Sequence, residues 1–179
     1  MTAIFLFFLS NPGAPGAERV EVTLLASGSF CSAQDVDFVV CRTQKELDKA
    51  ISEFGIPQKE SMTADFGTSV VCLAFAGQHP TAGYGIEAKA AYYLFYAEGG
   101  FDYWNMAIAP LLQEDGLAPD NVPMAQLREG DAIVILQAKC PPEGAMLAQV
   151  ITSPFIVFSL QLKDPKNVYV SIVGCGGGE

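Results

Sequence analysis

Short runs of apolar residues, many of them β-branched or alternating with polar residues, recur along most of the chain. Such runs are typical of β-strands, which place successive side chains on opposite faces of a sheet. The run at 69–76 is apolar without interruption, which is the pattern of a central strand buried on both faces. The predicted strands lie at 19–27, 36–42, 69–76, 84–96, 132–139, 149–162 and 167–173.

One segment has the spacing of a helix instead of a strand. Thr43 opens the sequence T-Q-K-E, a capping box in which the Thr43 hydroxyl and the Glu46 carboxylate satisfy main-chain N–H groups at the helix start. Gly55 and Pro57 end the pattern. The sequence therefore predicts a helix over 44–54. Its apolar positions are Leu47, Ala50, Ile51 and Phe54.

Together these elements predict an α+β fold, with a curved, mainly antiparallel sheet of about seven strands and one packed helix. A single domain at 18–174 fits the chain length. It follows an apolar, flexible segment at 1–17 and precedes a flexible tail at 175–179. Glycines and prolines punctuate 98–128, which we interpret as an insertion with a short helix at 106–113.

Composition excludes several classes of function. Ten basic and twenty acidic residues give a net charge of −10, which disfavours a nucleic-acid partner. No run reaches the ~20 apolar residues that span a bilayer, so we expect no transmembrane span. Residues 3–9 are apolar and 11–17 are rich in Pro, Gly and Ala, as at the end of a secretory signal, yet no Lys or Arg precedes them. An incomplete signal and a first apolar strand both stay open.

The five cysteines do not have the spacing of a metal site. No two form C-x-x-C, and the chain has one histidine, so we expect no metal and no cofactor. Cys41 and Cys72 lie in apolar strand-like runs and are predicted to be buried free thiols. Cys31 and Cys140 lie in loops, where a disulfide between them stays open. Cys175 belongs to the terminal G-C-G-G-G-E.

The loop between two predicted strands, G-Q-H-P-T-A-G-Y, is the strongest candidate for a binding surface. Pro80 restricts the main chain and the glycines permit turns, while Tyr84 supplies an amphipathic ring. A rigid loop with one aromatic anchor suits protein recognition, because little entropy is lost on docking. The alternative is a stiff hairpin turn whose Tyr84 fills its own core. The candidate loop residues are Gly77, Gln78, His79, Pro80, Thr81, Ala82, Gly83 and Tyr84.

No motif indicates catalysis. His79 is the only histidine, so a Ser–His or Cys–His pair would need it, and no nucleophile motif accompanies it. A carboxylate pair for acid–base catalysis could be formed by Asp35 with Asp37, or by Glu53 with Glu60. Acidic residues this frequent in a sequence usually lie on a solvated face instead. Phosphate-binding glycine motifs are also missing from the sequence. We expect no catalytic residues and no enzymatic activity.

Two longer stretches resemble a known family. The sequence V-V-C-L-A-F-A-G-Q-H-P-T-A-G-Y-G-I-E, and later T-S-P-F with Pro154 and Phe155, are similar to the C-terminal domain of PrcB-like proteins, subunits of protease complexes. There a strand leads into G-x-x-P-T-G-G-Y, and T-x-P-[YF] begins a later strand. The resemblance covers about 20–173. Ala82 replaces a usual glycine, and 98–128 is longer than the family pattern.

The resemblance implies an extracytoplasmic protein that associates with a secreted protease and has no catalytic residues. The shorter sequence P-T-A-G-Y is also similar to the loop that chagasin-like inhibitors insert into cysteine proteases. On that analogy Pro80, Thr81, Gly83 and Tyr84 would line the contact.

The resulting hypothesis is a non-catalytic, extracytoplasmic protein-binding domain that stabilises or restrains a protease. Its predicted partner-binding residues are the loop 77–84 together with Pro154 and Phe155. The first alternative is a direct protease inhibitor that uses the same loop. The second is a carrier of a small ligand, enclosed by the aromatic strand at 84–96 and by 98–128 acting as a lid.

Overall fold

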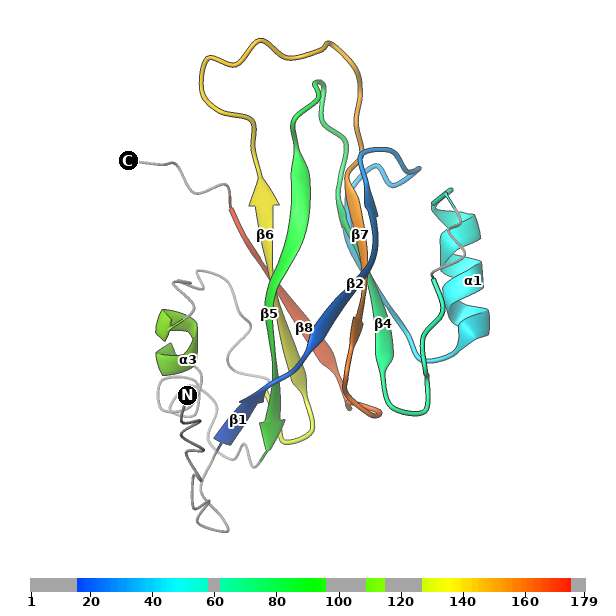
Figure 1. The fold of residues 1–179 in the computed structure, drawn as a ribbon, viewed down its shortest axis with the longest axis vertical. Helices are drawn as coiled ribbons and strands as arrows, with labels where there is room; N and C mark the ends of the chain where they lie inside the picture. The colour runs from blue at the N-terminus through cyan, green and yellow to red at the C-terminus, as the bar shows by residue number, and fades with distance from the viewer. Residues whose placement is uncertain (1–15, 58–61, 96–108, 115–126, 175–179) are drawn as a thin grey trace, which may run out of the picture.

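The computed structural model describes residues 16–57, 62–95, 109–114 and 127–174. In these residues two four-stranded sheets pack face to face, with a helix against the outer face of one of them (Figure 1). One sheet has the order β1-β5-β6-β8 and the other the order β2-β7-β4-β3. The elements are β1 Gly16–Arg19, β2 Val22–Gly28, β3 Val36–Cys41, α1 Gln44–Glu53, β4 Val70–Ala76, β5 Gly85–Phe95, α3 Ala109–Glu114, β6 Ala132–Lys139, β7 Phe155–Leu160 and β8 Val168–Val173. The α+β class and the mainly antiparallel pairing are confirmed.

Strand β4 shows why its sequence is apolar throughout. Cys72 and Ala74 face the other sheet and belong to the core between the two sheets. Leu73 and Phe75 face the opposite way, into the core beneath α1. Both faces of β4 are therefore buried, as the uninterrupted apolar run predicts.

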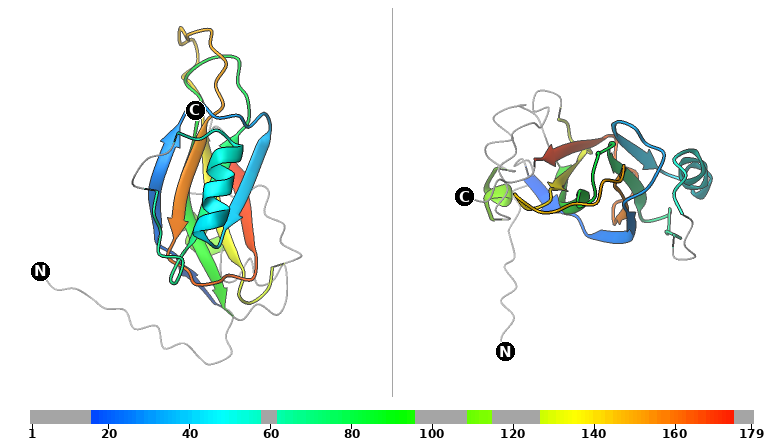
Figure 2. Two further views of the ribbon diagram at one scale, coloured as in Figure 1. Left: turned by 90° about the vertical axis from the view of Figure 1, so that its right-hand side faces the viewer. Right: turned by 90° about the horizontal axis from the view of Figure 1, so that it is seen from above.

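Helix α1 lies across the outer face of the β2-β7-β4-β3 sheet (Figure 2). Thr43 caps it, with its hydroxyl accepting from the N–H of Glu46 at 3.2 Å. The Glu46 carboxylate accepts from the N–H of Arg42 at 2.7 Å, one residue earlier than the usual capping box. Phe54 ends the helix and stacks on Phe75, with ring centroids 4.2 Å apart.

The predicted strand at 19–27 is wrong in one respect, because it is two strands in two sheets. The Val20 N–H donates to Ala91 in one sheet, whereas the Glu21 carbonyl accepts from Gln161 beside the other. Val20 is buried between the sheets. The chain therefore crosses from one sheet to the other at Val20–Glu21, which alternation along the sequence does not reveal.

The other predicted strands match observed ones within a few residues, except that β7 begins at Phe155, six residues after the start of the predicted strand at 149–162. Strand β8 pairs with β6 in parallel. Strand β5 contains a bulge at Lys89, where the register with β6 shifts. As a result Ile86 faces the inter-sheet core before the bulge and Ala91 faces it afterwards.

Parts of the chain outside these elements leave some expectations untested. Most of the predicted insertion at 98–128, and the segments 1–15 and 175–179, lie outside the described residues. Helix α3 overlaps the short helix predicted at 106–113. Within the described ranges, no helix has both the length and the apolar character to cross a membrane.

Candidate functional site

Three loops gather at one end of the sandwich, opposite the end where β1 begins (Figure 2). We call 29–35, 77–84 and 140–152 the apex loops. The candidate loop 77–84 is the middle one, and 140–152 arches beyond it (Figure 1). The sequence predicts loop 77–84 as a surface but does not reveal its two neighbours.

Main-chain hydrogen bonds fix loop 77–84 to loop 140–152. His79 and Thr152 exchange N–H···O bonds of 2.8 and 2.9 Å, which continue the pairing of β4 and β7 beyond the strand ends. The Ala82 N–H donates to the Ala148 carbonyl at 3.1 Å. The buried Thr152 hydroxyl donates to the Thr81 carbonyl at 3.0 Å. Loop 77–84 therefore has a defined conformation.

Loop 29–35 is attached to the same framework. The Gln78 N–H donates to the Gln34 carbonyl at 3.0 Å, and the Ser153 N–H donates to the Ser29 carbonyl at 2.9 Å. The Ser153 hydroxyl also donates to the Ala33 carbonyl. Main-chain hydrogen bonds thus connect the three apex loops at one end of the β2-β7-β4-β3 sheet.

Gly77 permits the close approach of loops 77–84 and 29–35. Its φ is +76°, a conformation that favours glycine. A Cβ at this position would lie 3.2 Å from main-chain atoms of both Asp35 and Val36. The sequence indicated a turn here, and the packing adds a second requirement for glycine.

The rings of His79 and Tyr84 stack at the apex. Their centroids are 4.0 Å apart and their planes differ by 7°. With Val36, Cys140 and other residues they line an apolar hollow of about 220 Å³. Tyr84 is half-buried, so it is neither a plug of the main core nor a free side chain.

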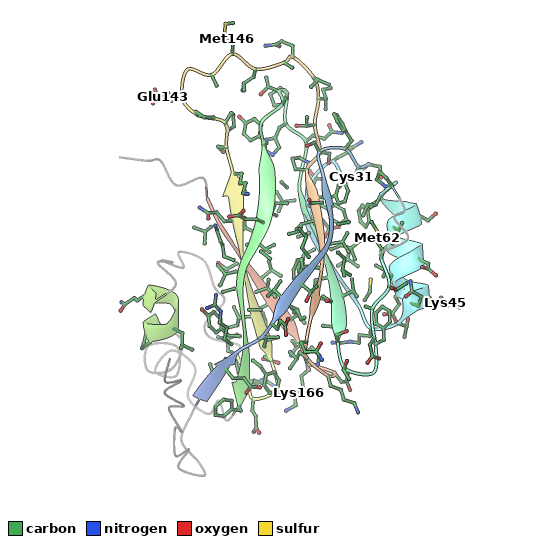
Figure 3. The ribbon with its side chains drawn as sticks, viewed as in Figure 1. Cys31, Lys45, Met62, Glu143, Met146 and Lys166 are labelled. Atoms are coloured by element: carbon green, nitrogen blue, oxygen red, sulfur yellow. The ribbon has the colours of Figure 1, made fainter. Side chains whose placement is uncertain are left out.

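The apex also carries exposed apolar side chains that are not among the predicted partner-binding residues. Met146 is 100% exposed and lies at the tip of loop 140–152 (Figure 3). Among the described residues, most large apolar side chains with high exposure belong to the apex loops or to the adjoining start of β3. These are Phe30, Val36, Met146, Val150 and Ile151. The apolar residues that follow C-P-P-E-G in the sequence could have indicated this exposed surface. Their pattern instead resembles that of a strand and predicts one.

Two predicted partner-binding residues lie beneath the surface. Phe155 is 4% exposed and belongs to the core under α1, and Pro154 is buried. Neither offers surface to a partner in this conformation. Within the candidate loop, Gln78, Pro80 and Gly83 are exposed, Gly77 is buried, and the others are half-buried.

The bonding of the cysteines rules out a disulfide that the sequence left open. Cys31, Cys41 and Cys72 are free, whereas Cys140 is disulfide-bonded, so a Cys31–Cys140 bond is wrong. The Cys31 thiol instead donates to the Ser153 carbonyl at 3.2 Å. Cys41 and Cys72 are buried free thiols, as predicted. Burial, and secondarily the Glu46 carboxylate, raises the pKa of Cys41 to about 11, and burial also raises the pKa of Cys72.

The described side chains give no indication of a metal centre. In these parts of the chain, His, Cys, Asp and Glu form no group of three or more that could hold an ion. The stacked His79 has its ring against Tyr84.

No protein-family model, curated protein or solved structure matches this chain. The resemblance to PrcB-like proteins therefore depends on the sequence motifs alone.

Proposed function

We propose that the protein is a non-catalytic, extracytoplasmic binding module that docks on a protease through the apex loops and stabilises or restrains it. One observation carries the proposal: main-chain hydrogen bonds join three loops at the end of the sandwich where exposed apolar side chains gather.

Rigidity and apolar surface act together in such a module. Loops that are already ordered lose little conformational entropy on docking, so more of the contact energy remains as affinity. Met146 and Ile151 would bury apolar surface against a partner. The hollow beside Tyr84 is smaller than the about 300 Å³ at which small-molecule sites usually begin, and it suits an apolar side chain of a partner.

The protease and the compartment have separate support. The protease comes from the resemblance of the two motifs to PrcB-like proteins. The disulfide at Cys140 supports an oxidising compartment, since such bonds rarely persist in a reducing cytosol. The two buried thiols are consistent with this, because burial keeps them from exchange.

Direct inhibition is a second candidate. A narrow set of ordered loops at the end of a β-sandwich can enter a protease cleft. Because loop 140–152 arches beyond loop 77–84, Met146 would enter together with Pro80 and Tyr84. The carrier hypothesis stays a prediction, because most of its lid lies outside the described residues.

Capture from the source cell's envelope and culture fluid tests the proposal. Immobilised wild-type protein is compared with Met146→Glu and Ile151→Glu, which alter exposed positions and leave the core intact. Lys45→Glu is the control, because Lys45 is exposed on α1, away from the apex loops (Figure 3). We expect mass spectrometry to identify a protease that is retained by wild type and control and lost from both apex variants.

The captured protease then decides between the two roles. A loss of its activity on adding the protein supports inhibition, and a longer active lifetime supports stabilisation. Equal capture by all variants would show that the apex loops are not the interface. Capture of no protease would reject the protease partner.

A further inference from the structure

Strand β5 is paired along only part of one edge. It has eleven residues, and β1 pairs with the last four, from Tyr92 to Phe95. The bond from the Val20 N–H to the Ala91 carbonyl is where this pairing stops. Residues 85–88 and Ala90 pair with β6 on one side, and on the other side no described strand pairs with residues 85–90.

A groove lies beside this edge. After the crossing at Val20–Glu21, β2 runs in the other sheet and diverges from β5 (Figure 1). The space between them has a volume of about 600 Å³. Val22 and Leu24 of β2 contribute to its lining, and the buried Ile156 and Phe158 of β7 lie at its base.

Leu24 shows that the groove is unfilled by the chain's described residues. Its neighbour Val22 packs against the inter-sheet core, and Leu24, two residues further along the strand, is 60% exposed. In a regular strand these two side chains share a face. Leu24 therefore points toward the opposite sheet at a place where the described part of that sheet does not cover it.

Bulges lie on both sides of the groove. The pairing of β2 with β7 shifts between Leu24 and Ala26, and that of β5 with β6 shifts at Lys89. Bulges bend strands and are common at sheet edges and beside binding sites. Here they accompany the divergence of β2 from β5 that opens the groove.

We propose that this groove binds an extended peptide segment of a partner protein, which adds to the sheet as a strand beside residues 85–90. A free strand edge presents N–H and C=O groups in a row, and another extended main chain complements that row. Apolar side chains at alternate positions of the peptide contact the exposed Leu24 and the half-buried Val22. The proposal does not depend on the function of the apex loops.

The rim of the groove is charged and selects against indiscriminate pairing. Glu87 forms ion pairs with Lys89 and Lys139, and the hydrogen bonds from these lysines lower the pKa of its carboxyl. Arg19 and Glu21 also contribute to the lining of the groove. Lysine on an edge strand is a common device against aggregation. A ligand peptide thus needs polar residues that face this rim, in addition to its apolar alternation.

Selection from a displayed library of random twelve-residue peptides tests the proposal. Panning uses the wild-type protein, and binding of enriched peptides is then measured on Leu24→Glu and on Thr23→Glu. Both positions are exposed neighbours on β2, but Thr23 is not part of the groove lining. We expect Leu24→Glu to weaken binding about tenfold or more, because the new carboxylate would be desolvated, and Thr23→Glu to leave it unchanged.

Main-chain recognition has its own control. Methylation of alternate main-chain nitrogens of the peptide removes hydrogen-bond donors without changing its side chains. Only one of the two alternate sets of N–H groups would face β5, so methylation of that set should abolish binding and methylation of the other should not. Amide NMR signals of residues 85–90 should shift on titration, and alternate amides there should exchange rapidly in the free protein.

Three results would overturn the proposal. These are a failure to enrich any peptide, equal binding to Leu24→Glu, and slow exchange of all amides at 85–90 in the free protein. Self-association that Leu24→Glu abolishes would assign the groove to a second copy of this chain instead.

Discussion

Replacing Gly77 with alanine tests whether the apex loops are packed as closely as described. The φ of +76° at Gly77 is unfavourable for any residue that has a Cβ. The added methyl group would also lie 3.2 Å from main-chain atoms of Asp35 and Val36, and 3.3 Å from the Gln34 carbonyl oxygen. These are main-chain atoms of a hydrogen-bonded loop, which cannot rotate away as a side chain could.

The expected loss combines two contributions. A non-glycine residue in this conformation costs on the order of 1 kcal/mol or more. Overpacking against surroundings that cannot yield adds about 1–3 kcal/mol. We therefore expect Gly77→Ala to lower the free energy of unfolding by about 2–4 kcal/mol.

Gly144→Ala is a matched control in a neighbouring apex loop. Gly144 has φ +75°, nearly the same as Gly77, but no atom lies within 4 Å of the position of an added Cβ. Urea unfolding of both variants isolates the packing contribution, because the conformational contribution is common to both. If Gly77→Ala is no less stable than Gly144→Ala, the close approach of loops 29–35 and 77–84 is wrong.

Two further predictions concern the helix and the thiols. Thr43→Ala removes the cap of α1 and should lower the free energy of unfolding, measured in urea, by about 1 kcal/mol. Thr43→Ser keeps the hydroxyl and should retain most of this stability. Equal losses in the two variants would show that the hydrogen bond of the hydroxyl is unimportant. Because its pKa is raised to about 11, Cys41 is protonated in the native protein at pH 8, and Cys72 is protonated for the same reason. An alkylating reagent at pH 8 should therefore modify neither until urea is added, as mass spectrometry can measure, and rapid native labelling of either would contradict their burial.

The sequence predicted the elements that depend on local signals. Helix α1 begins and ends within one residue of the prediction, because its cap and its apolar spacing are both encoded within the segment. Strand β6 matches the predicted 132–139. Loop 77–84 was identified for similar reasons, since its turns require Gly77 and Gly83 locally.

The features that the sequence did not predict arise from contacts between distant segments. The crossing at Val20–Glu21 follows from bonds to Ala91 and Gln161, far along the chain. The bond between His79 and Thr152 brings together loops that no local pattern connects. The groove beside β5 likewise depends on which strand pairs with which. Periodicity describes the two faces of a strand and contains nothing about its neighbours.

The strand order also has a consequence for folding while the chain is still incomplete. Strand β7 lies between β2 and β4, so Val22 pairs with Leu160 although about three-quarters of the chain separates them. Until β7 is synthesised, β2 has no partner and β4 has only β3. Such distant pairing predicts folding in milliseconds to seconds rather than microseconds. The edges of β2 and β4 therefore stay unpaired until β7 is available. Unpaired apolar strands are prone to aggregation, so chaperones would be needed most during this period.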